Sequence, residues 1–490
     1  MTIKPKYLVL SLLMALGGIE PSNAATKPVD PRVLHIINRL SFGPRPGDIQ
    51  RVQSMGVESY IKEQLAPNSI PKPEKLKNQL SRLETIHLST VKVSEYFRTP
   101  PNPSPEQKKA SQKRDAQIQN EAIRARLLRA TTSPRQLQEV MVDFWFNHFN
   151  VNANKNNIRL WAGSYEQEAI RPHVLGRFRD LLGATARHPA MLLYLDNWQN
   201  QAGKSSGSHG RLNENYAREL MELHTLGANG GYTQQDVIAL ARIFTGWGFT
   251  RPMQQKKHST GFYFNPEHHD FSDKVFLKQQ IQGSGEAEGE QALDILAQSP
   301  ATARNISYKL AQYFVSDRPP NTLVDRLSKR FLDTDGDINA VLETLFQSPE
   351  FWDSKNFNAK FKTPYQYVVS VVRATGMEVN NTKPISQHLE SMAMPVYRYR
   401  TPDGYPNTQD RWLNPEAMTR RISFATAVAN GQLSIAGVVK NQNQSKPVDP
   451  ALLLNTLGNS FSESTQQAIA SHTSNLRSAL ILGSPEMMRR

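Results

Sequence analysis

The sequence contains no cysteine among its 490 residues. This absence excludes disulfide bonds, metal sites built from thiolates and catalysis by a cysteine nucleophile. The fold must therefore be stabilised by a large hydrophobic core. A chain of this length is sufficient for one large domain or two intimately packed domains.

Several catalytic signatures are missing as well. We find no serine nucleophile elbow joining a strand to a helix, no Walker phosphate loop, no dinucleotide-binding fingerprint after a strand and no HExxH pair. The alternating aspartates of residues 333–337 resemble a calcium loop, but Ile338 and Thr344 stand where an EF-hand needs glycine and glutamate. Asp337 is instead predicted to cap the helix that follows it.

Long apolar runs are also absent. No segment after residue 18 reaches the roughly 18–20 apolar residues that a membrane-spanning helix needs. A short apolar stretch from Tyr7 to Gly18 follows Lys4 and Lys6 and precedes the small residues before Ala24. This pattern predicts a secretory signal peptide at residues 1–24. The protein is therefore expected to be exported, to the periplasm or the exterior.

Acidic residues are outnumbered by basic ones, 44 against 58, so the net charge is +14 at pH 7. A basic protein favours acidic partners such as anionic glycans, although many exported proteins are basic without such a partner. Export, and the lack of a compact basic stripe interleaved with aromatic residues, argue against nucleic acid as a partner.

Helical periodicity dominates the sequence, and the predicted fold is mainly α-helical: a large, bundle-like domain over residues 25–490. The best-formed helices are predicted at residues 134–149, 163–186, 189–197, 213–226 and 233–245. Two aromatic or β-branched runs within residues 260–281 predict a small β-hairpin or lid. Residues 99–120, first proline-rich and then charged, predict a flexible insertion, and residues 439–449 a polar loop.

The first concentration of polar groups lies in "GRLNENYARELMELHTLGANGGYT", residues 210–233. A helical turn of 100° per residue places Glu214, Asn215, Arg218, Glu219 and Glu222 in one arc. A glycine- and serine-rich loop before the helix favours an anion or a substrate oxygen at its N-terminus. The alternatives are ordinary i,i+4 ion pairs and a buried network that only fixes helix packing.

The helix predicted at 233–245 carries Arg242 and is followed by Trp247. Together with the carboxylate-bearing helix before it, this pair of helices could form the walls of a cleft. Arg218 and Arg242 would then hold an anionic group, and Trp247 would bind the substrate.

A second concentration is "VMVDFWFNHFNVNANKNN", residues 140–157. Asp143 lies on a helix that is apolar nearly all round, so its carboxyl group must be paired or have a shifted pKa. Asn147, His148 and Asn150 follow near the end of that helix. These side chains could bind sugar hydroxyls, or they could cap the helix end.

The third concentration is Glu267-His268-His269-Asp270, at the centre of the predicted hairpin. Imidazole and carboxylate ligands suit zinc, iron or manganese, so His268, His269 and Asp270 are candidates for a divalent metal site or for a lid. Such a site would need a further ligand, such as Glu219 or Glu222. The simpler alternative is that these histidines cap or hydrogen-bond locally.

These segments, taken in order, resemble the bacterial family of unknown function DUF1800. The resemblance extends over residues 33–488 and rests on "MVDFWFNHFNV", "LNENYARELMELHTLG", "GGYTQQDVIALARIFTGWGF", "HHDFSDKVFL", "TARNISYKLAQYFVSDRPP" and "GYPNTQDRWLNP". It implies a large, commonly exported protein, often encoded beside a DUF1501-type protein, and brings no established reaction. Lys278 stands where the family pattern has glycine, which puts a tight turn in doubt, and Ser299 replaces a histidine.

Two functional hypotheses follow. The first is an exported enzyme, a hydrolase or lyase, that acts on an envelope or extracellular glycan with Glu219 and Glu222 as its carboxylates. The second is a non-catalytic adaptor or secretion partner that docks another protein, such as the DUF1501-type product. A cleft where the three polar concentrations converge would favour the enzyme, and their dispersal around a flat apolar patch would favour the adaptor.

Overall fold

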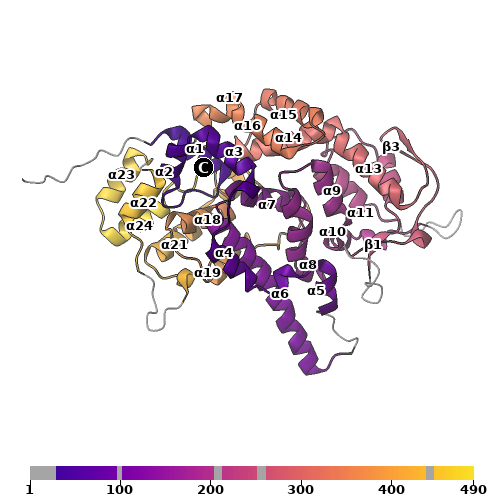
Figure 1. Cartoon of the computed structure of the whole chain (residues 1–490), viewed down its shortest axis with the longest axis horizontal. Helices are drawn as coiled ribbons and strands as arrows, with labels where there is room; N and C mark the ends of the chain where they lie inside the picture. The colour runs from indigo at the N-terminus through magenta and orange to yellow at the C-terminus, as the bar shows by residue number, and fades with distance from the viewer. Residues whose placement is uncertain (1–28, 97–101, 203–211, 251–260, 438–445, 459) are drawn as a thin grey trace, which may run out of the picture.

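The computed structural model describes residues 29–96, 102–202, 212–250, 261–437, 446–458 and 460–490 (Figure 1). The predicted signal peptide lies outside these ranges, as do most of the loop before Asn213 and most of the polar loop at 439–449. The described chain is mainly α-helical with two small antiparallel sheets, which confirms the predicted fold class. None of its described helices is long and apolar enough to cross a membrane.

The first helices begin and end at residues that the sequence marks. The side chain of Asp30 caps the first helix by accepting a hydrogen bond from the Arg32 amide (2.8 Å). Gly56, with φ 86°, separates the second helix from the third. The elements are α1 (Pro31–Leu40), α2 (Asp48–Met55), α3 (Val57–Leu65), η1 (Pro67–Ser69), α4 (Glu74–Ser81), η2 (Thr85–His87) and α5 (Thr90–Tyr96).

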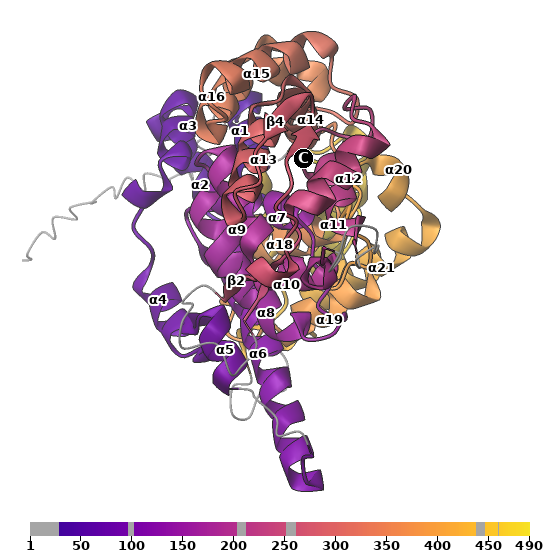
Figure 2. The same cartoon turned by 90° about the vertical axis from the view of Figure 1, so that its right-hand side faces the viewer.

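A 28-residue helix, α6 (Pro105–Thr132), occupies most of the segment that was predicted to be a flexible insertion. Its N-terminus is closed by a capping box, in which Ser104 and Gln107 each bond to the other's backbone amide. The first half projects from the body of the molecule (Figures 1 and 2), which explains why its sequence has no apolar face. The second half packs inward through Ile118, Ala122 and Ala125.

The middle of the chain is helical but more broken than its periodicity predicts. The single helix expected over residues 163–186 is interrupted by a π-helical turn, by a 3₁₀ turn at Pro172 and by Gly176. The elements are α7 (Gln136–His148), α8 (Ile158–Tyr165), η3 (Glu166–Ile170), η4 (Arg171–His173), α9 (Phe178–Arg187), α10 (Pro189–Tyr194), η5 (Asn197–Gln199), α11 (Asn215–Glu219), η6 (Leu220–His224) and α12 (Gln234–Ile243). Both η3 and η6 are π-helical, a form that is often found at functional sites.

The strands form two hairpin-like sheets instead of one. Strand β2 (Phe262–Phe264) pairs antiparallel with β1 (Trp247–Phe249), which precedes it in the chain. Strand β3 (Lys274–Phe276) pairs antiparallel with β4 (Gln279–Ile281). The turn between β3 and β4 places Leu277 and Lys278 at φ 48° and 65°. The tight turn that the sequence put in doubt at Lys278 therefore forms, with a left-handed backbone at two non-glycine residues.

The second half of the chain is an array of helices, several of which begin at a capping side chain. Asp337 caps α16, and Ser299 and Ser348, each followed by proline, cap α14 and α17. A short 3₁₀ turn, η8 (Pro266–His268), precedes β3. The elements after β4 are α13 (Glu286–Gln298), α14 (Pro300–Phe314), α15 (Asn321–Asp333), α16 (Ile338–Gln347), α17 (Pro349–Trp352), η9 (Ser354–Asn356), α18 (Pro364–Ala374), α19 (Lys383–Ser391), α20 (Gln409–Trp412), α21 (Pro415–Ala429), η10 (Ser434–Ala436), α22 (Pro450–Leu457), α23 (Glu463–Ala470) and α24 (Ser474–Leu482).

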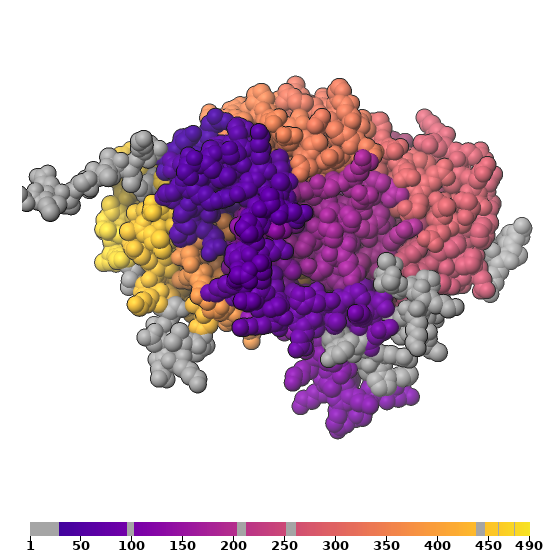
Figure 3. All heavy atoms as spheres, viewed as in Figure 1, coloured from indigo at the N-terminus to yellow at the C-terminus, as the bar shows by residue number. Residues whose placement is uncertain are grey.

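The two ends of the described chain lie side by side. Helices α1 and α2 contact the C-terminal helices, as Figures 1 and 3 show by the adjacent indigo and yellow regions. Gln50 on α2 donates a hydrogen bond to Asn455 on α22 (3.3 Å), and Gly458 contacts Leu34 and Ile49. The fold is therefore closed by contacts between residues more than 400 positions apart, which no local pattern could predict.

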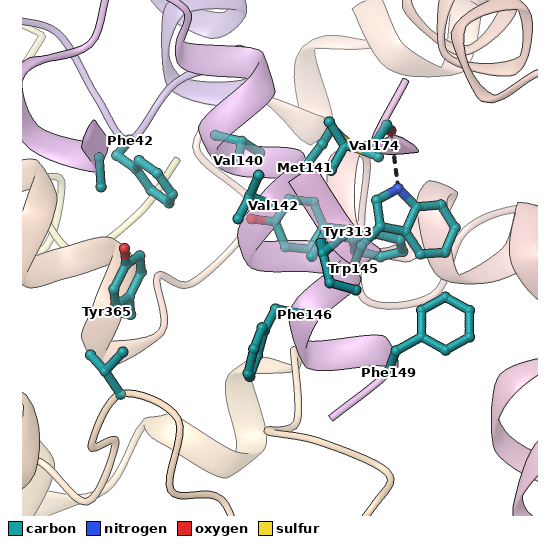
Figure 4. Packing of buried hydrophobic residues seen from close by; sticks show 14 of the residues in the cluster. Phe42, Val140, Met141, Val142, Trp145, Phe146, Phe149, Val174, Tyr313 and Tyr365 are labelled. Carbon is teal, nitrogen blue, oxygen red and sulfur yellow. Dashed lines mark hydrogen bonds between the residues drawn. The ribbon is translucent and has the colours of Figure 1, made fainter. Parts of the chain in front are cut away.

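Two helices, α7 and α18, form the centre of the core. Every residue of α18 is buried, and α7 buries Val140, Met141 and Trp145 completely. The indole N–H of Trp145 donates to the Val174 carbonyl (3.1 Å), as Figure 4 shows. Since these helices have apolar side chains nearly all round, each polar group on them must find a partner or line a cavity.

Gly289 on α13 provides a direct test of this packing. A Cβ atom at this position would lie 2.1 Å from Cζ2 of Trp247, whereas at Gly183 on α9 it would meet only the flexible end of Arg179. Glycine to alanine normally stabilises a helix by about 1 kcal/mol. We expect Gly183→Ala to follow that rule and Gly289→Ala to destabilise the fold by about 1–3 kcal/mol through overpacking. Urea denaturation of both variants would measure this, and equal stabilities would contradict it.

Candidate functional site

A cavity of about 200 Å³ lies between α7, α14, the start of α18 and the segment 394–407. Its walls combine aromatic rings with polar groups. The aromatic part includes five tyrosines: Tyr313, Tyr365, Tyr397, Tyr399 and Tyr405. A concave, largely aromatic space with a few convergent polar groups is the usual form of a ligand site.

The segment 394–407 is fastened to α7 by amide side chains. Asn147 donates to the Tyr405 carbonyl (2.8 Å) and accepts from the Tyr405 amide (2.7 Å), and Asn150 donates to the Thr401 carbonyl (2.8 Å). Gly404, at φ 74°, lies so close that a Cβ atom would be 2.1 Å from the Asn147 carbonyl oxygen. The predicted polar end of α7 therefore builds the wall of the cavity, with Asn147 and Asn150 bonded to backbone.

A buried ion network reaches the cavity through Arg126 and Asp143, which line it. Arg126 donates to Asp143 and to Glu166 (2.8 Å each), and Arg171 pairs with Glu166 and Glu139 (2.9 Å each). Burial raises the pKa of Asp143, although Arg126 opposes the shift. Burial alone would also raise the pKa of Glu166, but the surrounding arginines outweigh it and lower that pKa to about 2. Asp143 was predicted to be paired or to have a shifted pKa, and the structure pairs it with Arg126. Of the two carboxyl groups on Arg126, only that of Glu166 has a lowered pKa.

Lys309 and His148 form a second polar pair in the same cavity. Nε2 of His148 donates to the His224 carbonyl (3.1 Å), so Nδ1 is the acceptor facing Nζ of Lys309 (3.2 Å). The Lys309 amine also donates to the Leu223 carbonyl (3.0 Å). Burial lowers the pKa of Lys309 to about 8, and burial with Lys309 beside it holds the pKa of His148 well below 6.5. The cavity therefore contains an amine that loses its proton near neutral pH beside a neutral imidazole.

Tyr397 is held in a strained backbone conformation at the cavity wall. Its φ is 63°, in the left-handed region that bulky residues rarely adopt. The hydroxyl donates to Glu166 (2.8 Å), while the carbonyl oxygen accepts from the Ala153 amide (2.8 Å). Strain of this kind persists only where the surroundings enforce it, and it concentrates at functional sites.

The carboxylate-bearing helix 213–226 lies next to this cavity but does not line it. Burial, and then the carboxylates of Glu222 and Asp403, raise the pKa of Glu219. Asp403 lines the cavity, and its carboxylate is near enough to Glu219 to act on that pKa. Tyr232 donates to Glu222 (3.4 Å). The first and second polar concentrations are therefore neighbours, linked through Asp403 and through the His148 bond to the His224 carbonyl.

Two other residues of this helix have local roles. Asn215 donates to the Leu195 carbonyl (3.1 Å), and Arg218 bonds to Glu214 and Gln234 (3.0 Å each). The i,i+4 pair of Glu214 and Arg218 is the surface ion pair that the sequence offered as the simpler alternative.

The third concentration lies elsewhere. Arg242 pairs with Asp270 (2.7 Å) and with Ser272. His269 places Nδ1 2.8 Å from the Thr245 carbonyl oxygen and Nε2 2.8 Å from Glu288, which leaves neither nitrogen for a metal. His268 lies in η8, half-buried, and none of the three joins the cavity.

The expected divalent metal site finds no ligand set here. Among the residues that the structure describes, no three His, Cys, Asp or Glu side chains are grouped to hold a metal ion. Trp247, expected to bind substrate, is 1% exposed and packs in the core against Gly289, with the Arg187 guanidinium 5.5 Å from its ring centroid. Arg218, Arg242 and Trp247 thus do not form the walls of one cleft.

Several residues of the cavity were not predicted from the sequence, above all Arg126, Lys309, Tyr397 and Asp403. Lys309 occupies one position of an otherwise ordinary amphipathic helix, and Arg126 lies within the charged stretch of α6. The cluster of tyrosines in "PVYRYRTPDGY", residues 395–405, was a signal that could have been noticed. No periodicity brings it beside α7, because that contact spans about 250 residues.

The Glu166 network gives a stability prediction with a defined pH dependence. Glu166→Gln leaves Arg126 and Arg171 buried without their shared counter-charge, so we expect a loss of about 3 kcal/mol near pH 7. Glu214→Gln, which removes an exposed ion pair, should cost less than about 1 kcal/mol. The folded-state pKa of Glu166 lies below its usual 4.5. Its contribution is therefore complete above about pH 4.5 and is lost as the pH falls through about 2.

Urea denaturation of wild type and both variants at about pH 7 and about pH 3 would test this, because the wild-type advantage over Glu166→Gln must shrink at the lower pH. A loss for Glu166→Gln no larger than that for Glu214→Gln would contradict the central role of this network.

Comparison with known proteins adds a family but no activity. No curated protein and no solved structure matches the chain. The sequence profile of the family described as "Protein of unknown function (DUF1800)" matches residues 35–489, which is nearly the whole sequence. The match includes α7, α14 and the segment 394–407, and with them every wall of the cavity. The chain belongs to the DUF1800 family.

Proposed function

We propose that this protein is an enzyme that cleaves a glycan by acid–base chemistry, and that the cavity between α7, α14 and the segment 394–407 is its active site. One observation carries the proposal. The amine of Lys309, with its pKa lowered to about 8, lines the same cavity as the carboxyl group of Asp143, whose pKa is raised. Two titratable groups with pKa values displaced by their surroundings are what proton transfer at neutral pH requires.

The roles of the two groups follow from their charge. Unprotonated Lys309 is the base: it takes a proton from water in hydrolysis, or from a sugar carbon in elimination. Asp143 in its protonated form gives a proton to the oxygen of the leaving sugar. His148 accepts a hydrogen bond from Lys309 through Nδ1 and so aims the amine. Lys309 cannot transfer its charge to His148, because burial keeps that imidazole neutral.

The remaining walls suit a sugar. The faces of tyrosine rings pack against the apolar face of a pyranose, while their hydroxyls and nearby amides bond to its polar edge. Gln366 and the hydroxyl of Tyr313, 3.1 Å apart, show such a polar pair at the cavity. Glu219, near the cavity, is proposed to bind or protonate a neighbouring sugar unit. The carboxylate of Glu222 contributes to the raised pKa of Glu219.

The proposed location is outside the cytoplasm, on the strength of the predicted signal peptide. This location fits an envelope or extracellular glycan. The alternative, an adaptor for a DUF1501-type protein, would require an exposed apolar face. Among the described residues the exposed large hydrophobic side chains include Phe271, Leu332 and Ile422, which lie before β3, on α15 and on α21. The cavity gathers aromatic and polar groups in one place, so we favour the enzyme.

The proposal predicts a specific effect of substituting Lys309. Lys309→Met should lower the rate of polymer cleavage by about 10²–10⁴-fold, the usual contribution of a general base. The wild-type rate should rise with pH up to about 8, as Lys309 loses its proton. Assays on a panel of neutral and acidic polysaccharides would measure new reducing ends, and ultraviolet absorbance of unsaturated products would separate elimination from hydrolysis.

The matched control is Lys329→Met, at an exposed lysine on α15 that pairs with Asp333 and does not line the cavity. It should leave the rate unchanged. Full activity of a correctly folded Lys309→Met variant would remove the centre of the proposal, and so would a wild-type rate that is independent of pH between about 6 and 9.

A further inference from the structure

A second and larger space, of about 560 Å³, lies on the other side of one wall of the cavity. It lies between α6, α8, the start of α19 and the segment 396–398. Residues Val396, Tyr397 and Arg398 line both spaces. This volume falls within the roughly 300–1,000 Å³ of ligand sites. The strained Tyr397 is thus part of a thin partition between two pockets.

The charges that line this second pocket are unbalanced. Four cations, Arg124, Arg159, Lys383 and Arg398, face a single carboxylate, that of Glu390. Arg398 pairs with Glu390 (3.0 Å), and Arg159 pairs with Asp115 outside the pocket (3.0 Å).

Two of the four cations remain without a carboxylate partner. Arg124 and Lys383 have no ion pair with any carboxylate of the described chain. Arg124 donates only to the Asn380 carbonyl (3.3 Å), and its Nε is buried without a partner. The N-terminus of α19, which begins at Lys383, adds the positive end of a helix dipole.

Neutral polar groups complete the lining. Gln119, Asn120 and Gln387 border the pocket, and within the described chain their side-chain amides bond to no other residue. Amides beside cations suit a ligand that carries both hydroxyl and acidic groups. A simple inorganic anion would use the cations and leave the amides unused.

We infer that this pocket binds acidic sugar units, and that the glycan cleaved in the neighbouring cavity is a uronate-bearing polymer. The inference rests on the proposed function. A polymer that crosses Arg398 would place one unit at Lys309 and another between Arg124 and Lys383. The bound carboxylate groups would supply the counter-charge that the pocket lacks.

Isothermal titration calorimetry with the full chain tests the inference. The probes are tetramers of galacturonate, mannuronate and guluronate, the neutral tetramers maltotetraose and cellotetraose, and inorganic phosphate. We expect at least one uronate tetramer to bind more tightly than either neutral tetramer, and its affinity to fall with added salt. Arg124→Gln/Lys383→Gln should weaken that binding about tenfold or more, because it removes two charge-assisted hydrogen bonds to the acidic groups.

The control is Lys329→Gln/Arg330→Gln, which removes the same charge from the exposed face of α15 and should change the affinity less than about twofold. Lys383→Gln alone, at an exposed position, keeps the test available if the double variant does not fold. Equal affinity for acidic and neutral tetramers would overturn the inference. Phosphate binding as tight as that of the tetramers would also overturn it, and so would a double variant that binds like wild type.

The two proposals fail in different ways. Charge-dependent binding of a uronate tetramer without cleavage of any uronate polymer would leave the binding site standing and remove the proposed enzyme. Lys309-dependent cleavage of a neutral glycan, without preference for acidic tetramers, would support the enzyme and remove the acidic-sugar site.

Discussion

The guanidinium of Arg126 is the interaction on which the site depends. It comes from the buried end of α6 and joins Asp143 on α7 to Glu166 at the start of η3. Glu166 in turn holds Arg171 and the hydroxyl of Tyr397. One buried cation thus fixes three helical segments and the strained wall of the cavity. Buried pairs of this kind add little net stability, but removing one partner is costly. The network therefore selects one arrangement of these segments and adds little to the free energy of unfolding.

Burial, more than any single contact, sets the chemistry of the cavity. The same desolvation that raises the pKa of Asp143 lowers those of Lys309 and His148, because each shift favours the neutral form. Glu166 escapes this effect only because several arginines surround it. The proposed acid–base roles of Asp143 and Lys309 rest on this common effect of burial.

The polar clusters of the sequence divide into two kinds once they are folded. The ends of α7 and of the 213–226 helix meet around His148, Asp403 and Glu219, where charges are incompletely matched. His269 and Asp270 instead form closed pairs: Asp270 with Arg242, and His269, together with Lys274, with the buried Glu288. Groups whose hydrogen-bonding capacity is fully used inside the protein hold the fold together, and groups left over face cavities.

The sequence by itself determined the helical class, the cap at Asp337, and the need of Asp143 for a partner or a shifted pKa. These follow from local rules: periodicity, the orphan amides of a helix N-terminus and the cost of burying a charge. It could not reveal that α6 is an ordered helix, because exposed helices carry no apolar stripe. Nor could it show that Lys309, Arg126 and Tyr397 line one cavity, or that His268, His269 and Asp270 lie outside that cavity. Only the tertiary structure decided which side chains meet, since contacts across hundreds of residues depend on how whole helices pack and on no pattern within any one of them.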